Sequence, residues 1–166
     1  MFKKNLKEIS LNFIVVLTIF LADRLSKIYI LKIFELENKV DIYLSNYLNF
    51  YLIWNKGIAF GLFSFNESLI YNIISTIIAL IALAIIVIAI KSKGFKKYSL
   101  LLVFGGSLGN LFDRIYYSAV PDFIDFHVNN FHWFVFNVAD IFITLGIICL
   151  IIDEILTKDK KNEKII

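Results

Sequence analysis

The fold is decided by one uncharged stretch of sequence, LIYNIISTIIALIALAIIVIAI, which runs from Leu69 to Ile90. A helix of about 20 apolar residues is long enough to cross the hydrocarbon core of a bilayer, which is roughly 30 Å thick. Three more apolar segments lie at roughly Leu11–Leu31, Tyr98–Tyr117 and Phe134–Ile152. Together they predict an all-α membrane protein with four transmembrane helices.

The composition agrees with a bilayer as solvent. Of the 166 residues, 59% are hydrophobic, and the mean hydropathy is +0.77. A soluble globular chain is usually about 45–50% apolar. The length suits one domain, and no linker or internal repeat divides the chain. We therefore expect residues 1–166 to form a single membrane domain.

The basic residues indicate an orientation in the membrane. The net charge is +3, and 11 of the 17 Lys and Arg residues lie in three clusters, at 3–7, 91–97 and 158–164. Cytoplasmic segments of membrane proteins carry the excess of Lys and Arg. Four spans place all three clusters on that side, so both termini are expected to be cytoplasmic. Because the clusters flank apolar runs, we expect no nucleic-acid partner.

This orientation leaves two segments on the outer side. The first, 32–68, contains alternating stretches at 40–44 and 49–52. Alternation is typical of half-buried strands, so a small β-rich segment is expected between the first two helices. The second, 118–133, is interpreted as a short loop. It carries Asp122, Asp125, His127 and His132.

All charged side chains within the predicted spans lie towards the outer face. A charge near the centre of a span costs about 2.5–3.5 kcal/mol on insertion scales and by default marks a functional site. Several of these residues are three or four positions apart, which places them on one side of a helix. The alternative is a set of ion pairs and hydrogen bonds that only hold the helices together. The polar residues concerned are Asp23, Lys27, Asn110, Asp113, Arg114, Asn137 and Asp140.

Carboxylates are the main candidates for acid–base chemistry. Two carboxylates in a poorly solvated site can share one proton, so that one acts as a base and the other as an acid. Asp23 has Lys27 one helical turn away, and Asp113 is next to Arg114, which favours structural ion pairs. Asp122 and Asp140 have no basic residue within four positions and are freer to act as the pair.

Other catalytic chemistries are less well supported. The two histidines are five positions apart in the predicted loop, and there is no His-Glu-x-x-His motif, so neither a metal nor a cofactor is expected. The single cysteine, Cys149, lies deep in the fourth apolar run and is interpreted as a small buried hydrophobe.

Five motifs in register carry a resemblance to a known family. They are DRLSK at 23–27, NKGIAFG at 55–61, GGSLGNLFDR at 105–114, VPDFIDF at 120–126 and FNVAD at 136–140. In order, spacing and position relative to the four spans, the chain resembles bacterial lipoprotein signal peptidase, also called signal peptidase II. Arg24 and Pro121 depart from the family, which often has an uncharged polar and an aliphatic residue there.

The resemblance implies a membrane-embedded aspartic endopeptidase of the bacterial cytoplasmic membrane. It would cut diacylglyceryl-modified prolipoproteins before the lipidated cysteine, near the outer leaflet. By motif position, Asp122 and Asp140 match the catalytic pair. The positions matching residues that support the site or contact substrate are Asp23, Lys27, Asn55, Gly57, Asn110, Asp113, Arg114, Asn137 and Ala139.

Two other functional classes compete with the peptidase. A small proton-coupled transporter would carry polar residues throughout the membrane depth, but the inner halves of the spans are almost wholly apolar. A structural membrane subunit would leave the outer polar residues unexplained. Apart from the substrate, membrane lipids are the expected partners, and a monomer is expected because one chain can supply the whole site.

Overall fold

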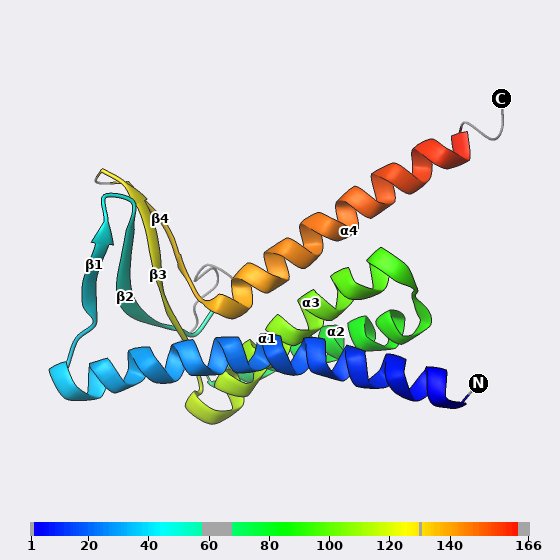
Figure 1. The fold of residues 1–166 in the computed structure, drawn as a ribbon. Helices are drawn as coiled ribbons and strands as arrows, with labels where there is room; N and C mark the ends of the chain where they lie inside the picture. Colours follow the sequence, from blue (N-terminus) through cyan, green and yellow to red (C-terminus); the bar gives the residue numbers. More distant parts are fainter. Residues whose placement is uncertain (1, 58–67, 130, 163–166) are drawn as a thin grey trace.

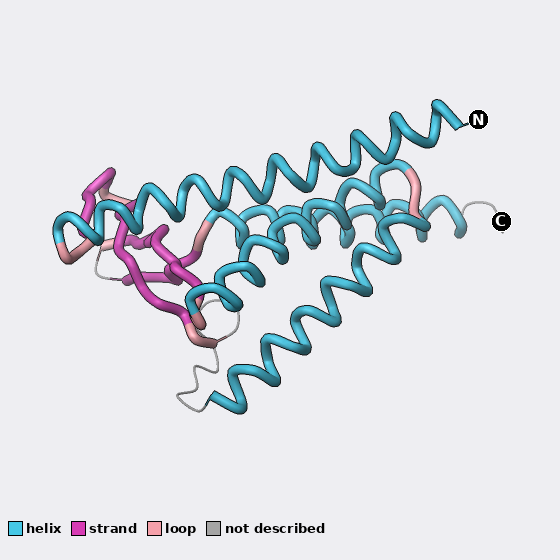
Figure 2. The backbone as a smooth tube through the Cα atoms, turned by 90° about the horizontal axis from the view of Figure 1, so that it is seen from below, coloured by secondary structure: helices cyan, strands magenta, loops and turns pink. Residues whose placement is uncertain are grey.

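The computed structural model describes residues 2–57, 68–129 and 131–162, which form four helices and four strands (Figure 1). In chain order these are α1 (Phe2–Glu37), β1 (Asp41–Ser45), β2 (Leu48–Asn55), α2 (Ser68–Lys91), α3 (Gly94–Tyr117), β3 (Val120–Val128), β4 (Phe131–Phe136) and α4 (Val138–Asn162). The sheet lies at one end of the helices, and both termini lie at the other (Figures 1 and 2).

The helices are long enough to cross a bilayer, and they differ in polarity. By length and composition, the described residues contain one helix apolar enough to do so, Leu69–Lys91, with a mean hydropathy of 3.2. The other three have 36, 24 and 25 residues, and 24 residues of helix extend about 36 Å. They carry more charged residues. Four spans therefore stay a prediction.

The sheet is larger than the sequence predicts. Its order is β1-β2-β3-β4, with every neighbouring pair antiparallel. The segment 118–133 is thus not a loop, and an all-α class is incomplete. β3 is buried at most successive positions, so it shows no alternation that would reveal a strand. In the sequence, the aromatic run of β4 looks like the start of an apolar helix, which is why the fourth span is expected to begin at Phe134. In the structure, α4 begins at Val138.

Helix α3 packs between the other helices, against α1, α2 and α4. Its glycines let the neighbours come very close. A Cβ atom at Gly106 would lie 2.5 Å from the Ala139 carbonyl oxygen, and one at Gly109 would lie 2.5 Å from Asp23 Oδ2. Small residues at helix interfaces allow such close approach. The contact brings polar groups of α1, α3 and α4 together beneath the sheet.

A small apolar core joins the sheet to the helices. Ile30 of α1, Val40 and Phe123 of β3 are buried against one another. Phe123 and Phe50 of β2 also meet edge to face, with ring centroids 5.6 Å apart. Burial of such side chains is worth about 1.5–3 kcal/mol each. This core holds β3 firmly over the helices, which fixes the position of its neighbour Asp122.

Candidate active site

Two carboxylates from different elements meet where the sheet joins the helices. Asp122 lies near the start of β3, and Asp140 lies in the first turn of α4. Both are buried, with exposures of 2% and 8%. Both line one cavity of about 230 Å³, together with polar residues of β2 and α3. The structure thus brings together the two aspartates that the sequence singles out.

Asn137 connects the two carboxylates through the start of α4. Its Oδ1 accepts a hydrogen bond from the Asp140 backbone N–H at 3.2 Å, and Asp140 Oδ2 accepts one from the Asn137 N–H at 3.2 Å. This reciprocal pattern is that of a capping box. With Oδ1 engaged in the cap, Asn137 Nδ2 donates to Asp122 Oδ1 at 2.6 Å. One capping residue therefore orients both aspartates.

Two further asparagines donate hydrogen bonds to the remaining oxygens of the two carboxylates. Asn55 Nδ2, at the end of β2, donates to Asp122 Oδ2 at 2.8 Å, and Asn110 Nδ2 of α3 donates to Asp140 Oδ1 at 2.8 Å. Each carboxylate thus receives neutral donors on both oxygens. Among the described residues, neither has an ion-pair partner.

The electrostatic setting favours a proton on the pair. Burial, and next the negative charge of Asp140, raise the pKa of the Asp122 carboxyl to about 7. The hydrogen bonds from Asn55 and Asn137 act in the opposite direction and offset only part of this effect. A buried carboxylate beside another carboxylate is expected to behave in this way. Near neutral pH, Asp122 can therefore hold a proton.

A charged cluster next to the cavity supports the pair, and Lys27 lies at its centre. The Lys27 side chain is fully buried, and its Nζ donates to Asp23 Oδ2 at 2.9 Å, Asp113 Oδ2 at 2.6 Å and Asn110 Oδ1 at 2.9 Å. These bonds use all three donors of an ammonium group. Because the bond to Asn110 occupies its oxygen, the amide nitrogen of Asn110 faces Asp140.

Asp23 ties this cluster directly to the start of α4. Its Oδ1 accepts a hydrogen bond from the Ala139 backbone N–H at 3.0 Å. Ala139 is fully buried against α3. An unpaired N–H in the first turn of a helix needs such an acceptor, and a negative charge is favourable there. Asp23 therefore fixes the first turn of α4, which carries Asp140, through the backbone of Ala139.

The ion pairing of α3 differs from the sequence interpretation in one respect. Asp113 does not pair with its neighbour Arg114, because adjacent residues point to different sides of a helix. It pairs with Lys27 and, at 2.5 Å, with Arg24 of α1. Arg24 appears in the sequence only as a departure from the family pattern. In the structure it supplies the second cation for the two carboxylates of the cluster.

Arg114 instead reaches the cavity and the end of β2. It lines the cavity beside Asp122, and its Nη2 donates to the Gly57 carbonyl oxygen. Gly57 N–H in turn donates to Asn55 Oδ1 at 2.8 Å, which orients the Asn55 amide. Residues 58–61 of the same motif lie outside the described residues, so the expectation for that part of it is untested.

Three polar residues of the site are not among those that the sequence singles out. Ser107 and Thr144 line the cavity, and Tyr71 of α2 donates its O–H to the Arg114 carbonyl oxygen at 3.1 Å. Helical spacing could have found the first two, because Ser107 is three positions from Asn110 and Thr144 is four from Asp140. Tyr71 gives no comparable signal, since its partner is on another helix.

An apolar cavity of about 350 Å³ adjoins the polar one. It lies between β4 and the start of α4, and Asp140 and Thr144 line both cavities. Aromatic residues supply most of its wall. They are Phe126, Trp133, Phe134 and Phe136. Asp140 therefore lies between the cavity that it shares with Asp122 and an aromatic-walled one.

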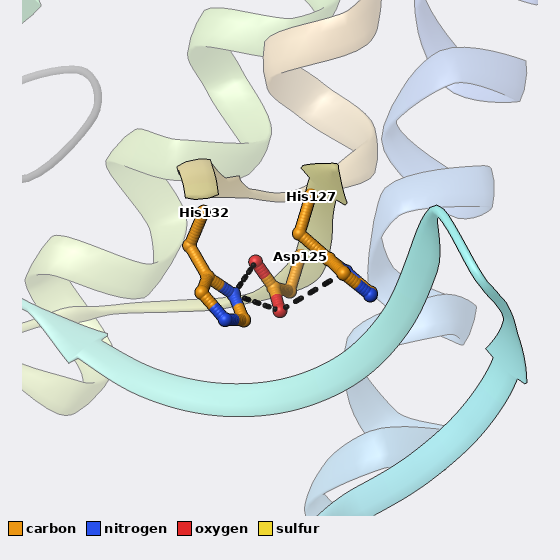
Figure 3. A group of neighbouring side chains, drawn as sticks. All are labelled: Asp125, His127 and His132. Carbon is orange, nitrogen blue, oxygen red and sulfur yellow. Dashed lines mark hydrogen bonds and ion pairs between the residues drawn. The ribbon is translucent and has the colours of Figure 1, made fainter. Parts of the chain in front are cut away.

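A separate group of possible metal ligands lies farther along the hairpin of β3 and β4. Asp125, His127 and His132 point towards one another in Figure 3, with one ligand atom of each within 4.8 Å of the others. The sequence interpretation placed both histidines in a loop, but they face each other on paired strands. None of the three lines the cavity of Asp122 and Asp140.

The comparisons with known proteins agree on one family. The family model described as "Signal peptidase (SPase) II" matches residues 15–156. The chain is similar to a protein named lipoprotein signal peptidase from Pelagibacter ubique (strain HTCC1062), with 55% identity over 98% of both chains. A protein of the same name from Anaplasma phagocytophilum (strain HZ) is 37% identical over 90% of this chain and 95% of its own.

Solved structures support the same fold. One, titled as a bacterial membrane enzyme structure obtained by the in meso method, superposes with a TM-score of 0.72 at 28% identity. It covers 93% of this chain and 92% of its own. A second with a similar title has a TM-score of 0.70 at 26% identity, covering 87% and 92%. Helices with a sheet at one end are therefore a shared architecture.

Proposed function

The chain belongs to the signal peptidase II family, and from that premise we propose that it is an aspartic endopeptidase that removes the signal peptide from prolipoproteins. Membership of this family identifies the chain as a peptidase of a bacterial membrane. The observation that carries the aspartic mechanism is the pair Asp122 and Asp140, buried in one cavity with amide donors on both carboxylates.

The pair can divide the acid and base roles between its members. Asp140, in its ionised form, takes a proton from a water molecule, and the oxygen attacks the scissile carbonyl carbon. Asp122, which holds a proton near neutral pH, donates a hydrogen bond to that carbonyl oxygen. Asp140 then gives the proton that it took from water to the leaving amine nitrogen as the C–N bond breaks, which returns the pair to its starting state. Two carboxylates with one shared proton are sufficient for these steps.

Arg114 and Asn55 are the candidates for holding the substrate backbone. Arg114 Nη1 is buried and makes no hydrogen bond within the part of the chain that the structure describes. Because Arg114 lines the cavity, this nitrogen can donate to a peptide carbonyl. A positioned donor of this kind strengthens as negative charge develops on the oxygen. Asn55 lines the same cavity and can contact the same backbone.

The apolar cavity beside Asp140 supports a lipid-modified substrate. We propose that acyl chains of a diacylglyceryl cysteine occupy the space between β4 and α4, because its wall is mostly aromatic and aliphatic. The peptide bond before that cysteine would then lie next to Asp140. Burial of acyl chains is worth about 0.8 kcal/mol per CH₂ group, which favours the modified precursor over an unmodified one.

The proposed topology follows from the basic clusters and the position of the sheet. All four helices span the bilayer, both termini and the loop at 91–97 are cytoplasmic, and the sheet lies outside. Large exposed apolar side chains on every helix support this arrangement, since such surface is stable in lipid. Because α1, α3, α4 and the sheet supply the site from one chain, we propose a monomer formed by a single domain over residues 1–166.

Cleavage of a defined precursor tests the proposal. The protein, purified in detergent, is given a prolipoprotein carrying diacylglyceryl on its cysteine, and the product is followed on a gel. The same precursor without the lipid, and the Asp140→Asn variant with the lipid, are the controls. Cleavage confined to the lipidated precursor and the native protein supports the proposal. Absence of cleavage by folded native protein would overturn it.

A further inference from the structure

The two histidines of the chain both lie in the hairpin of β3 and β4, outside the peptidase site. The sequence contains no others. His127 of β3 and His132 of β4 are directly paired across the strands, and their rings stack with centroids 5.1 Å apart. Asp125 is two positions before His127, so its side chain points to the same face of β3. Three side chains able to bind a metal therefore share one face (Figure 3).

The ligand atoms are already close to the spacing of a metal site. Asp125 Oδ2 lies 2.8 Å from His132 Nδ1 and 3.7 Å from His127 Nδ1. A tetrahedral Zn²⁺ with bonds of about 2.0–2.2 Å holds its ligand atoms about 3.3–3.6 Å apart. The shorter separation is that of a hydrogen bond, which a bound ion would replace, and the other is slightly longer than the range. All three ligand atoms lie within 4.8 Å of one another, so side-chain rotation alone has to close the site.

One of these ligand atoms is buried without a hydrogen bond. His127 is only 8% exposed, and its Nδ1 has no hydrogen-bond partner within the part of the chain that the structure describes. A buried polar atom left without a partner is destabilising by about 1–3 kcal/mol. The nitrogen lies on the side of Asp125 and His132, so a cation between the three groups would satisfy it.

A second buried polar atom, the side-chain oxygen of Asn49, belongs to a residue paired with Asp125. Asn49 of β2 is directly opposite Asp125 in the ladder, and residues in that relation place their side chains side by side on one face. Asn49 Oδ1 is also buried without a hydrogen-bond partner among the described residues. An amide oxygen next to a metal ligand can serve as a further ligand or as an acceptor for a bound water.

We propose that Asp125, His127 and His132 form a binding site for a divalent transition metal of the zinc type. Two imidazoles and one carboxylate are a common three-ligand set for this ion, with the fourth position left for water or another oxygen. His132 is 59% exposed in its side chain, so an ion can enter from solvent.

The bound ion would act as a clamp on the hairpin. It connects β3 to β4 across the ladder, close to the point where the His127 N–H donates to the Tyr47 carbonyl oxygen at 3.0 Å. Asp122 lies on the same strand, three residues before Asp125 and outside the group of metal ligands. Because none of the three ligands lines the cavity of Asp122 and Asp140, the ion would stabilise the hairpin and take no part in peptide cleavage. The proposed metal site therefore does not depend on the proposed peptidase function.

Direct titration tests the site. Tag-free full-length protein in detergent, first stripped with a chelator, is titrated with Zn²⁺ by calorimetry, and with Co²⁺ while its visible absorption is recorded. We expect one ion per chain, a higher unfolding temperature with Zn²⁺, and Co²⁺ bands typical of a tetrahedral site. Absence of saturable binding to the folded native protein would overturn the proposal.

Variants locate the bound ion. His132→Ala changes an exposed side chain, and Asp125→Asn keeps the shape of the side chain, so together they cover a failure of either one to fold. Each should weaken binding at least about tenfold, as loss of a ligand or its support does. The matched control is Asp41→Asn on β1, whose carboxylate is exposed, and it should bind like the native protein. Unchanged binding by folded His132→Ala would overturn the assignment.

Discussion

Two pairs of buried aspartates lie side by side in this molecule, and they differ in what surrounds them. Asp23 and Asp113 are matched by two cations, Lys27 and Arg24, at ion-pair distances of 2.5–3.9 Å. Asp122 and Asp140 receive only neutral donors, from asparagine amides and a backbone N–H. All four carboxylates are less than a tenth exposed.

We propose that partners, and not burial, separate a structural aspartate from a reactive one. A carboxylate matched by a cation holds elements together, although such a pair adds little net stability. Two carboxylates without cations repel each other, and one of them retains a proton. On this proposal the charged cluster serves as support, and the uncharged surroundings of Asp122 and Asp140 allow the two carboxylates to share a proton.

The largest expected effect comes from neutralising either member of the reactive pair. Asp122→Asn and Asp140→Asn should each lower the single-turnover rate of prolipoprotein cleavage at least about 10³-fold, because an amide can serve neither as base nor as acid. Both should remain folded, since the change is isosteric. The rate is measured by gel mobility with a diacylglyceryl precursor.

The matched comparison is Asp113→Asn in the charged cluster. This variant should keep measurable cleavage while its unfolding temperature falls, because Lys27 and Arg24 lose a partner. Full cleavage by either folded variant of the reactive pair would break the distinction between the two pairs of aspartates.

The next largest effect is expected from removing the central cation. Lys27→Met leaves Asp23 and Asp113 short of one buried positive charge, which should cost about 3–5 kcal/mol of unfolding free energy. It also frees the Asn110 amide to turn away from Asp140. The measurement is chemical or thermal unfolding in detergent.

An exposed ion pair supplies the control for Lys27→Met. Lys158→Met removes the partner of Glu154, 4.0 Å away, and should change stability by about 0–1 kcal/mol. Equal effects of the two variants would show that the cluster is not a buried support.

A smaller effect should follow from loss of the cap that joins the reactive pair. Asn137→Ala removes the acceptor for the Asp140 N–H and the donor to Asp122. Loss of such a cap costs about 0.5–2 kcal/mol, and we expect cleavage to fall about 10- to 100-fold because both carboxylates lose their orientation. Asn137→Asp keeps the cap but not the donor. If it cleaved like the native protein, the donor to Asp122 would be dispensable.

The pH dependence of cleavage should follow the proton on Asp122. Its pKa is raised to about 7, so the protonated form is present below that pH and is lost as the pH rises through it. We expect the cleavage rate to decline by roughly tenfold per pH unit once the pH is well above 7. A rate that stays constant from pH 6 to pH 9 would contradict the assignment of the acid.

The smallest expected effect is that of chelators on cleavage. A carboxylate pair needs no metal, so EDTA should change the cleavage rate less than about twofold. If the hairpin of β3 and β4 binds zinc, the same treatment should lower the unfolding temperature. The two readouts on one sample separate the peptidase site from the metal site. Loss of cleavage that Zn²⁺ restores would contradict a metal-free mechanism.

Much of the site could be predicted from the sequence because its residues lie at the ends of apolar runs. Asp140 follows this rule, and helical spacing correctly relates Asp23 to Lys27. The choice of Asp122 and Asp140 rested on the absence of nearby basic residues in the sequence. The structure agrees that no cation pairs with them among the described residues.

The parts of the site and of the fold that the sequence does not predict depend on contacts between segments far apart in the chain. Lys27 and Asn110 are 83 positions apart, and the pairing of Arg24 with Asp113 crosses from α1 to α3. β3 escaped detection because it is buried on both faces and therefore lacks alternation. β4 merged with α4 in the sequence because its aromatic residues continue the apolar run. The pairing of His127 with His132 was hidden because the segment 118–133 reads as a loop and not as two paired strands.

The central claim is that Asp122 and Asp140 share a proton, with Asp122 as its carrier near neutral pH. Infrared difference spectroscopy of the full chain in detergent, between pH 5 and pH 9, detects the C=O stretch of a buried protonated carboxyl group. We expect one such band that disappears with a midpoint near pH 7 and is absent in Asp122→Asn. Its persistence in folded Asp122→Asn, or its absence from the native protein at pH 5, would contradict the account.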